Sequence, residues 1–415
     1  MFPAPEKNFL GRPHYLILIC LTLLTIFGQG CATLRHYKAL PENLEKHAQI
    51  PGLPDARDWA DAPSKILLKS ALESLEQEKA ANHGKLKPVV YGLALSGGGG
   101  DGAFGAGLLC GWSKAGTRPT FKLVTGISTG ALMSPFAFLG PAYDQRLKEA
   151  YTTISDKDIF TQHNILAILL SLANIRPLPS MASTKPLAKL LVKLIDAKLL
   201  EDVAAEHLKG RRLLVGTTQL DAQRLVIWDM GAIAVSNYPH KLDLFRKVLL
   251  ASASIPVAFN PQFFTVTAGG EEFQEMHVDG GVQVEVMLYE DAIKPFAIGG
   301  QRRRKLYIIR NEQVDPKCED VKPQLMDIAI RSIDSLFKAQ GVNDLYRLYA
   351  YAQSDGQDYN VAYTPRNLPF KPKSEFDTRF MNQLFDYAYN LAKAGYPWIK
   401  HPPGFDPHRH GSGRH

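Results

Sequence analysis

The sequence predicts an α/β protein with a mostly parallel central sheet. The apolar runs "VVYGLAL" (89–95) and "FKLVTG" (121–126) read as strands, and each leads through a tight glycine-containing loop into an apolar helical pattern. Repeated strand–loop–helix units are typical of parallel sheets, because parallel strands need a crossover connection that is usually a helix. The composition of the 415 residues, 45% hydrophobic and 21% charged, is that of a globular protein and excludes a wholly disordered chain.

The remaining elements follow in order along the chain. The stretch from Ser64 to Gly84 predicts an amphipathic helix that a glycine ends, and Thr184 to Lys209 predicts one long helix with Gly210 as its stop. Residues 211–218 and 224–230 predict a pair of strands, 244–256 a helix, and 305–310 a further strand. From Asn311 onward the pattern indicates mostly helices. The apolar segment from Asn164 to Asn174 fits an element that meets lipid acyl chains and a buried helix equally well.

The N-terminus has the features of a secretion signal. Lys7 and Arg12 precede an uninterrupted apolar run from Tyr15 to Gly28, which at fourteen residues is shorter than the roughly 20 that span a bilayer. Cys31 follows small residues at the end of this run and resembles the lipid-modified cysteine of bacterial lipoproteins. We expect residues 1–30 to be a signal peptide, Cys31 to carry a lipid anchor, and the protein to lie in the cell envelope. The resemblance to lipoproteins implies that Ala32, in place of Asp after the cysteine, directs the protein to the outer membrane rather than the inner one.

The cysteines and histidines give no sign of a disulfide framework or a metal site. Cys20 and Cys31 belong to the signal region, so only Cys110 and Cys318 remain in the body of the chain. No C-x-x-C, H-E-x-x-H or calcium-loop spacing occurs. We expect no metal and no cofactor, and we interpret Cys110, in the apolar "GLLCGW", as a small buried thiol.

The net charge of +7 does not indicate nucleic-acid binding. Lysines and arginines are scattered, and the one tight run, Arg302 to Lys305, stands before a predicted strand and reads as a solvated turn. A nucleic-acid footprint normally spreads over a face of the protein. A mildly basic surface also suits anionic lipid headgroups.

A glycine-rich loop, Ser96 to Gly107 ("SGGGGDGAFGAG"), follows the first predicted strand. Such a loop binds anions through bare backbone N–H groups, and either a phosphate or the oxyanion of an ester under hydrolysis would suit it. Gly100 to Gly105 is a literal G-x-G-x-x-G, but a dinucleotide site needs an acid about 20 residues later, at the end of the next strand. That strand ends instead in Gly126-Ile127-Ser128-Thr129-Gly130. A dinucleotide-binding oxidoreductase therefore stays open only as a weaker alternative.

The motif at Gly126 to Gly130 is G-x-S-x-G between a strand and a helix. In this setting the serine sits on a strained turn that leaves no room for flanking side chains, so we interpret Ser128 as a nucleophile supported by Gly126 and Gly130. A nucleophilic serine needs a general base, but His163, His207 and His240 do not stand at the end of a predicted strand, where such a base is expected. Asp279, on the Asp-Gly-Gly turn with Gly280, could accept the serine proton directly.

These three ordered motifs resemble the patatin-like phospholipases, serine lipid acyl hydrolases with a Ser–Asp dyad, over about Pro88 to Arg310. The segment "ASASIPVAFNP" from Ala251 also looks like the family's segment ahead of the aspartate. The resemblance implies a three-layer α/β/α domain that cleaves carboxylic esters of lipids, and it carries over Ser128 as nucleophile and Asp279 as general base. The N–H groups of Gly98, Gly99 and Gly100 would then form the oxyanion hole.

One position departs from the family pattern. Where G-G-G-x-Arg/Lys-G has its basic residue, this chain has Asp101. If the basic residue is essential, the protein is a weak or inactive enzyme that binds lipid. If that residue only holds the loop, a local hydrogen bond of Asp101 would serve as well.

The resulting domain organisation has five parts. After the signal peptide come an N-terminal extension (31–87), a catalytic domain (88–310), a helical C-terminal extension (311–400) and a disordered tail (401–415) rich in Pro, Gly and His. The expected partners are a lipid ester substrate and the membrane that holds the anchor, and the sequence leaves the oligomeric state open.

Overall fold

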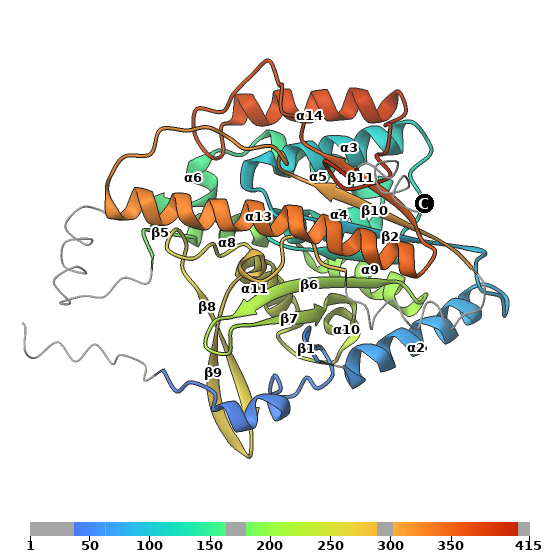
Figure 1. Ribbon diagram of the computed structural model, residues 1–415. Coiled ribbons are helices and arrows are strands. Elements are labelled where there is room, and N and C mark those ends of the chain that lie inside the picture. Colours follow the sequence, from blue (N-terminus) through green and yellow to red (C-terminus); the bar gives the residue numbers. More distant parts are fainter. Residues whose placement is uncertain (1–36, 63, 163–179, 289–301, 406–415) are drawn as a thin grey trace, which may run out of the picture.

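The computed structural model describes residues 37–62, 64–162, 180–288 and 302–405. They form a nine-stranded sheet with helices on both faces (Figure 1). The strand order is β1-β7-β6-β3-β2-β10-β11, and β9 pairs with β6 and with β8. The predicted three-layer α/β/α class with a mostly parallel central sheet is therefore confirmed.

The strands are β1 Arg57–Trp59, β2 Val89–Leu95, β3 Leu123–Gly126, β6 Arg212–Gln219, β7 Arg224–Asp229, β8 Gln262–Ala268, β9 Glu271–Asp279, β10 Arg303–Arg310 and β11 Asp358–Tyr363. A separate short pair comprises β4 Thr161–Gln162 and β5 Ala182–Ser183. The central strands β6, β3, β2, β10 and β11 are parallel, whereas β1, β7, β8 and β9 join antiparallel. The register pairs Leu95 with Gly126, so the carboxyl ends of β2 and β3 meet at one edge of the sheet.

The α-helices are α2 Lys65–Ala81, α3 Gly102–Lys114, α4 Thr129–Leu139, α5 Asp144–Thr152, α6 Asp156–Ile159, α8 Lys185–Leu194, α9 Ala197–Leu208, α10 Met230–Val235, α11 Lys241–Ser252, α13 Leu325–Ser354 and α14 Thr378–Lys393. Short 3₁₀ turns are η1 Glu42–His47, η2 Gly99–Asp101, η3 Pro141–Tyr143 and η4 Gly280–Val282.

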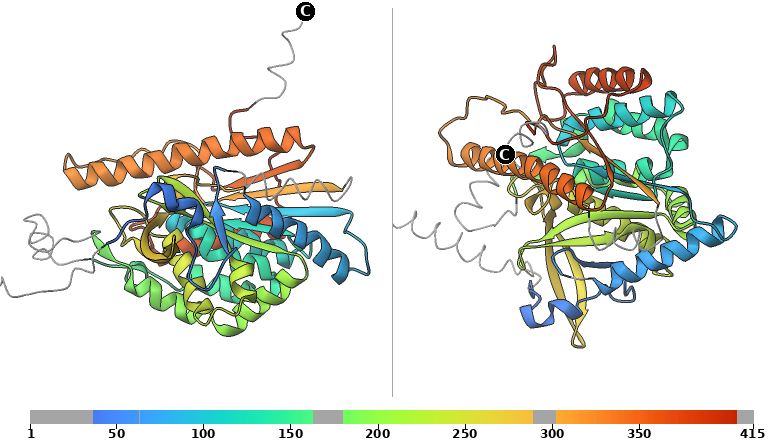
Figure 2. Two further views of the ribbon diagram at one scale, coloured as in Figure 1. Left: turned by 90° about the horizontal axis from the view of Figure 1, so that it is seen from below. Right: turned by 45° about the vertical axis from the view of Figure 1, so that its right-hand side comes forward.

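Alternating side chains of the strands build two hydrophobic cores. In β2, Leu93 and Leu95 join the core beneath α3, α4, α11 and α14, while Ala94 joins the core beneath α2 and α13. This is the two-residue period of a strand buried on both faces. Figure 2 shows α13 on one side of the sheet, with α3 and α4 on the other.

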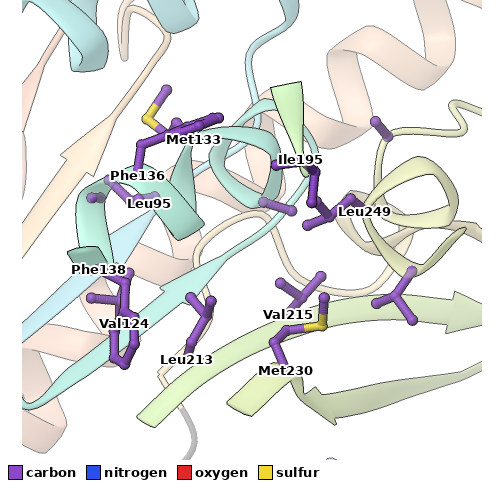
Figure 3. Close-up of a cluster of buried hydrophobic side chains, with 14 of the residues drawn as sticks. Leu95, Val124, Met133, Phe136, Phe138, Ile195, Leu213, Val215, Met230 and Leu249 are labelled. Atoms are coloured by element: carbon purple, nitrogen blue, oxygen red, sulfur yellow. The ribbon is translucent and has the colours of Figure 1, made fainter. Parts of the chain in front are cut away.

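The core beneath α4 fixes this helix on the sheet. Figure 3 shows side chains of α4 and of β2, β3 and β6 filling the space between them. The residues of this core that are labelled in Figure 3 are Leu95, Val124, Met133, Phe136, Phe138, Ile195, Leu213, Val215, Met230 and Leu249. Each large apolar side chain buried here contributes about 1.5–3 kcal/mol relative to exposure. The start of α4 is consequently held rigidly at the end of β3.

One predicted helix is wrong in its extent. Residues 184–209 form two helices, α8 and α9, instead of one, and the break falls at Ile195 and Asp196. The Asp196 carboxylate accepts the Leu199 N–H at 2.8 Å and so starts a new helix. The predicted helix after Ser64 is confirmed as α2, with the Ser64 hydroxyl capping the Leu67 N–H at 2.9 Å.

The C-terminal region contributes a strand that the sequence analysis did not identify. β11 pairs in parallel with β10 and extends the sheet, while α13 and α14 are the helices expected there. α14 packs closely on α3. A Cβ at Gly107 or at Gly111 would lie only 2.2 Å from a backbone oxygen of α14, so this contact requires glycine at both positions. The small residues of α3 therefore serve this helix contact.

Several predictions fall outside the described residues: the signal peptide, Cys31, the segment from Asn164 to Asn174, and residues 406–415 of the tail. Within the described ranges, no helix combines the length and the apolar character that crossing a bilayer requires. Arg302 directly precedes β10 and Arg303 to Lys305 lie on this strand, so the run is not the predicted turn. Arg302 pairs with Glu78 at 3.2 Å and Arg304 with Asp355 at 3.6 Å.

Candidate active site

Ser128 lies on the sharp turn between β3 and α4. Its backbone has φ 52° and ψ −124°, a conformation that non-glycine residues rarely adopt. Strain of this kind persists where the surrounding structure enforces it, and it is common at functional sites. The residue is only 6% exposed.

Both glycines of the turn are required by close backbone contacts. A Cβ at Gly126 would lie 2.5 Å from the Gly130 carbonyl oxygen, and a Cβ at Gly130 would lie 2.3 Å from the Leu95 carbonyl oxygen. Real Cβ atoms do not approach that closely, so no other residue fits without a backbone shift. The spacing of G-x-S-x-G thus follows from packing of the turn against the end of β2.

The end of α11 holds both Ser128 and Asp279. The Ser128 N–H donates to Ser252 Oγ at 3.0 Å, and this hydroxyl donates to the Gly216 carbonyl at 2.7 Å. Two residues on, the Ser254 carbonyl accepts the Asp279 N–H at 2.9 Å. Ser252 lies in the segment "ASASIP" ahead of the aspartate, but no local pattern in the sequence indicates its contact with Ser128.

Asp279 ends β9 and is fully buried. Its Oδ1 accepts the Gly281 N–H at 2.8 Å. The Ser128 hydroxyl interacts with this carboxyl and lowers its pKa. Oδ2 makes no hydrogen bond of standard geometry to any described residue and is the oxygen left for the hydroxyl. The fold thus brings Ser128 and Asp279, 151 positions apart in the chain, into one site.

The net effect of its surroundings is to raise the pKa of Asp279 well above the ordinary value. Burial is the main cause, and the negative charge of Glu285 adds to it, while Ser128 and the Gly281 N–H oppose the shift. The carboxylate accordingly has the proton affinity of a base that works closer to neutral pH. Gly280 beside it leaves no space for a side chain, since a Cβ would lie 2.7 Å from the Gly216 carbonyl oxygen.

Gly98 and Gly99 of the glycine loop lie where backbone N–H groups could bind an anion, and the Glu375 carboxylate lies against Gly99. Gly98 and Gly99 have φ of 137° and 50°, which favours glycine. Among the described residues, their N–H groups have no assigned acceptor. The Gly100 N–H, by contrast, interacts with the Glu375 carboxylate and lowers its pKa. Desolvation and nearby acids nevertheless raise that pKa overall, although Glu375 keeps solvent-exposed surface.

Other protein atoms occupy the space beside each glycine of the G-x-G-x-x-G pattern. A Cβ at Gly100 would meet the Glu375 carbonyl oxygen at 2.1 Å, one at Gly102 the Thr129 hydroxyl at 2.5 Å, and one at Gly105 Asn311 Oδ1 at 2.3 Å. These glycines permit close packing with the C-terminal region, with α4 and with the end of β10. This accounts for the pattern without a pyrophosphate.

Asp101, the departure from the family pattern, is partly exposed and crowded by other acids. Burial raises its pKa to about 8, and Glu375 and Glu312 add to the rise. At neutral pH the side chain is therefore mostly protonated. It then places little negative charge beside the loop.

Buried histidines of the domain are engaged away from Ser128. His277 contacts Glu275 at 3.0 Å and Thr217 at 2.8 Å. His207 lies 3.6 Å from Asp229, and burial is the main reason that its pKa falls to about 4. Among the described residues, no group of His, Cys, Asp and Glu has the geometry to hold a metal ion.

Two surface hollows in the described part of the chain, of about 520 and 480 Å³, lie elsewhere. The first is lined by α2 and Leu86, and the second by α3, α5 and α14 with Asp144 and Cys110. Neither includes Ser128 or Asp279. The chemistry and the burial of these two residues, not a surface hollow, identify the candidate site.

Comparison with known proteins finds one family-model match and several structural matches. Residues 93–288 match the family model described as patatin-like phospholipase. VipD from Legionella pneumophila is a structural match with 13% identity and TM-score 0.34, covering 74% of this chain and 67% of that one. Human GIVD cytosolic phospholipase A2 matches with 10% identity and TM-score 0.35, covering 85% of this chain and 64% of that one, which is less than two thirds of its length. No curated protein sequence matches significantly.

Proposed function

We propose that this protein is a serine lipid acyl hydrolase that cleaves carboxylic esters of lipids, since residues 93–288 match the family model described as patatin-like phospholipase. The observation that carries the proposal is the strained Ser128 turn with the buried Asp279 carboxyl beside it. A serine hydroxyl next to a base, on a turn that presents it at a helix N-terminus, is the arrangement of an activated nucleophile.

In the proposed first half-reaction, Ser128 Oγ attacks the acyl carbonyl carbon while Asp279 takes the hydroxyl proton. The tetrahedral intermediate collapses, the ester C–O bond breaks, and the proton on Asp279 passes to the departing alcohol oxygen. Water then attacks the acyl-enzyme, with Asp279 taking a proton from it. That proton returns to Ser128 as the fatty acid leaves.

The developing oxyanion needs preorganised donors, and we assign this role to the N–H groups of Gly98, Gly99 and Gly100. Gly98 and Gly99 support the assignment because no described acceptor occupies their N–H groups. The Gly100 N–H can contribute only when the Glu375 carboxylate gives way. Protonation of Asp101 at neutral pH removes an obstacle to negative charge at the loop.

Two variants test the dyad. Ser128→Ala and Asp279→Asn should each lower hydrolysis of a p-nitrophenyl acyl ester by at least about 10³-fold, because each removes a group without which the covalent step cannot proceed. Ser134→Ala is the matched control, since Ser134 is a nearby buried serine, within α4, whose hydroxyl donates to the Ala131 carbonyl at 2.9 Å. Undiminished turnover in either dyad variant, with fold verified by circular dichroism, would contradict the proposal.

A second candidate is a lipid-binding protein with weak or no catalysis. It is favoured by the Glu375 carboxylate at the Gly100 N–H and by the burial of Ser128. A fluorophosphonate separates the two, because only an activated serine is labelled. Adduct on Ser128 supports the hydrolase, whereas vesicle binding without adduct supports the binding protein.

We also propose that the protein is a lipoprotein of the cell envelope, anchored through Cys31, on the outer rather than the inner membrane. The support is the sequence alone: the basic residues Lys7 and Arg12, the apolar run, and the cysteine at its end. Mass spectrometry of the mature N-terminus tests it. A mass that begins at an acylated Cys31 is expected, and an uncleaved Met1 would refute it.

A further inference from the structure

Glu285 is a buried acid that the proposed reaction does not use. It follows the turn η4 and is 2% exposed. Its carboxyl lies between two glycines: a Cβ at Gly97 would be 2.6 Å from Oε2, and a Cβ at Gly281 would be 2.2 Å from Oε1. The carboxyl therefore fills the space between the glycine loop and the turn that carries Asp279, and only glycines admit it.

Other parts of the fold fix this carboxyl in place. Arg310 at the end of β10 donates from Nη1 to Oε2 at 2.7 Å, and Arg310 is itself 1% exposed. The guanidinium lies against Gly341 of α13, where a Cβ would be 2.6 Å from Cζ. The backbone is tied too, since the Glu285 N–H donates to Asp344 of α13 at 2.8 Å and the Glu285 carbonyl accepts the Gly97 N–H at 3.4 Å.

We propose that Glu285 is a positioning residue, which holds the glycine loop and Asp279 at a fixed separation and places a second acidic group beside that base. The inference rests on the proposed hydrolase function. Through its contacts with Arg310 and Asp344, Glu285 also connects the active site to the C-terminal region, since Asp344 belongs to α13.

The charge arrangement gives this role a measurable consequence. Glu285 raises the pKa of Asp279, while the Ser128 hydroxyl and the Gly281 N–H lower it. Burial raises the pKa of Glu285 itself to about 7, with Glu312 and Asp344 adding to the rise and Arg310 opposing it. The two carboxyls therefore titrate as a linked pair. Because Asp279 must be ionised to accept the serine proton, the pair sets the acid limb of the activity profile.

A purely structural ion pair between Glu285 and Arg310 makes a different prediction. Removing one partner of a buried pair lowers the free energy of unfolding, often by about 3–5 kcal/mol. It would not, however, change the pH at which the remaining activity titrates. The pH profile thus separates positioning of the base from structural support.

The test is the pH dependence of kcat/KM for a p-nitrophenyl ester in Glu285→Gln, which keeps the shape of the side chain and removes its charge. The acid limb should move to lower pH by roughly one unit, since a nearby negative charge typically raises a carboxyl pKa by that order. Glu312→Gln is the matched control: Glu312 also pairs with Arg310 but contacts neither Gly97 nor Gly281. Loss of the Glu312 charge lowers the pKa of Glu285 and so keeps Glu285 ionised beside Asp279. In Glu312→Gln the acid limb of the activity profile must therefore not move to lower pH.

A Glu285→Gln profile that superimposes on that of the unchanged protein would overturn the inference while leaving the hydrolase intact. Full activity of Ser128→Ala would instead overturn the hydrolase. Should Glu285→Gln fail to fold, Glu285→Asp gives a second reading, because it retains the charge and shortens the side chain by one methylene. The limb should then stay in place while kcat falls at least about tenfold, and an unchanged kcat would count against positioning.

Discussion

The backbone N–H of Ser128 donates a hydrogen bond to Ser252 Oγ at 3.0 Å, across 124 residues of chain. This bond satisfies a buried N–H on a strained turn. The Ser252 hydroxyl is itself held in place, because it donates to the Gly216 carbonyl of β6. α11 therefore acts as a brace for the turn that presents the serine.

Replacing Ser252 by Ala should lower both kcat and the free energy of unfolding. The change leaves the Ser128 N–H and the Gly216 carbonyl unpaired, at a cost of about 1–3 kcal/mol each, and relaxes the turn, so kcat should fall roughly tenfold or more. Ester hydrolysis and thermal unfolding measured together check this. Ser134→Ala, on the same side of the sheet, should keep its kcat, and equal rates for both variants would argue against the brace.

Gly130→Ala should prevent normal folding or lower the free energy of unfolding by about 3 kcal/mol or more. The added Cβ would stand 2.3 Å from the Leu95 carbonyl oxygen, which belongs to a central strand and cannot move aside. Gly92→Ala is the comparison, because its Cβ would meet only Leu306 Cδ1, at 3.7 Å. Denaturant unfolding of both proteins is the measurement, and a small, equal loss in each would contradict the packing argument.

Asp101 should make activity fall at alkaline pH. Its pKa is raised to about 8, so the side chain is neutral below that pH and becomes an anion near the oxyanion donors above it. We expect kcat/KM to decline above about pH 8 in the unchanged protein and to stay level in Asp101→Asn. Near pH 6.5 the two should differ little. A large gain in the variant at that pH would mean that the acid is charged in the neutral range.

Glu275 should contribute to acid unfolding. Although burial opposes it, Arg57 and His277 together lower the pKa of Glu275 to about 2. A depressed pKa stabilises the folded state above the ordinary value near 4.5, and that contribution, on the order of 3 kcal/mol, is lost as pH falls from 4.5 toward 2. Unfolding free energies at several pH values should therefore decline less steeply in Glu275→Gln. Glu271→Gln, with its exposed partner Lys38, should leave the slope unchanged.

The two cysteines of the described chain should differ sharply in reactivity. Burial raises the pKa of Cys110 to about 12, whereas Cys318 is exposed. Since the thiolate is the reacting form, an alkylating reagent at pH 8 should label Cys318 first and Cys110 only after unfolding. Peptide mass mapping at successive times measures this, and early label on Cys110 would contradict its burial.

Local patterns in the sequence were sufficient for much of the sheet and for the elements that carry Ser128. Strands β2, β3, β6 and β7 and helices α3 and α4 follow from runs of apolar residues bounded by glycine and polar turns, because period and punctuation are local properties. The boundary between α8 and α9 was missed because a cap at Asp196 competed with a continuous helical pattern. β11 was missed because a short strand at the sheet edge is specified mainly by its partner β10.

By itself, the sequence determined which residue types are available for chemistry: a serine between two glycines, an aspartate on a glycine turn, and a glycine loop after a strand. Only the tertiary structure decided which of them meet and in what electrical setting. It placed Asp279 beside Ser128, occupied Gly100 with Glu375, and packed Glu285 between the two glycine turns. Proton affinity and donor availability depend on neighbours that are distant in the chain, and those neighbours come together only through the parallel register of the sheet and the helices packed on it.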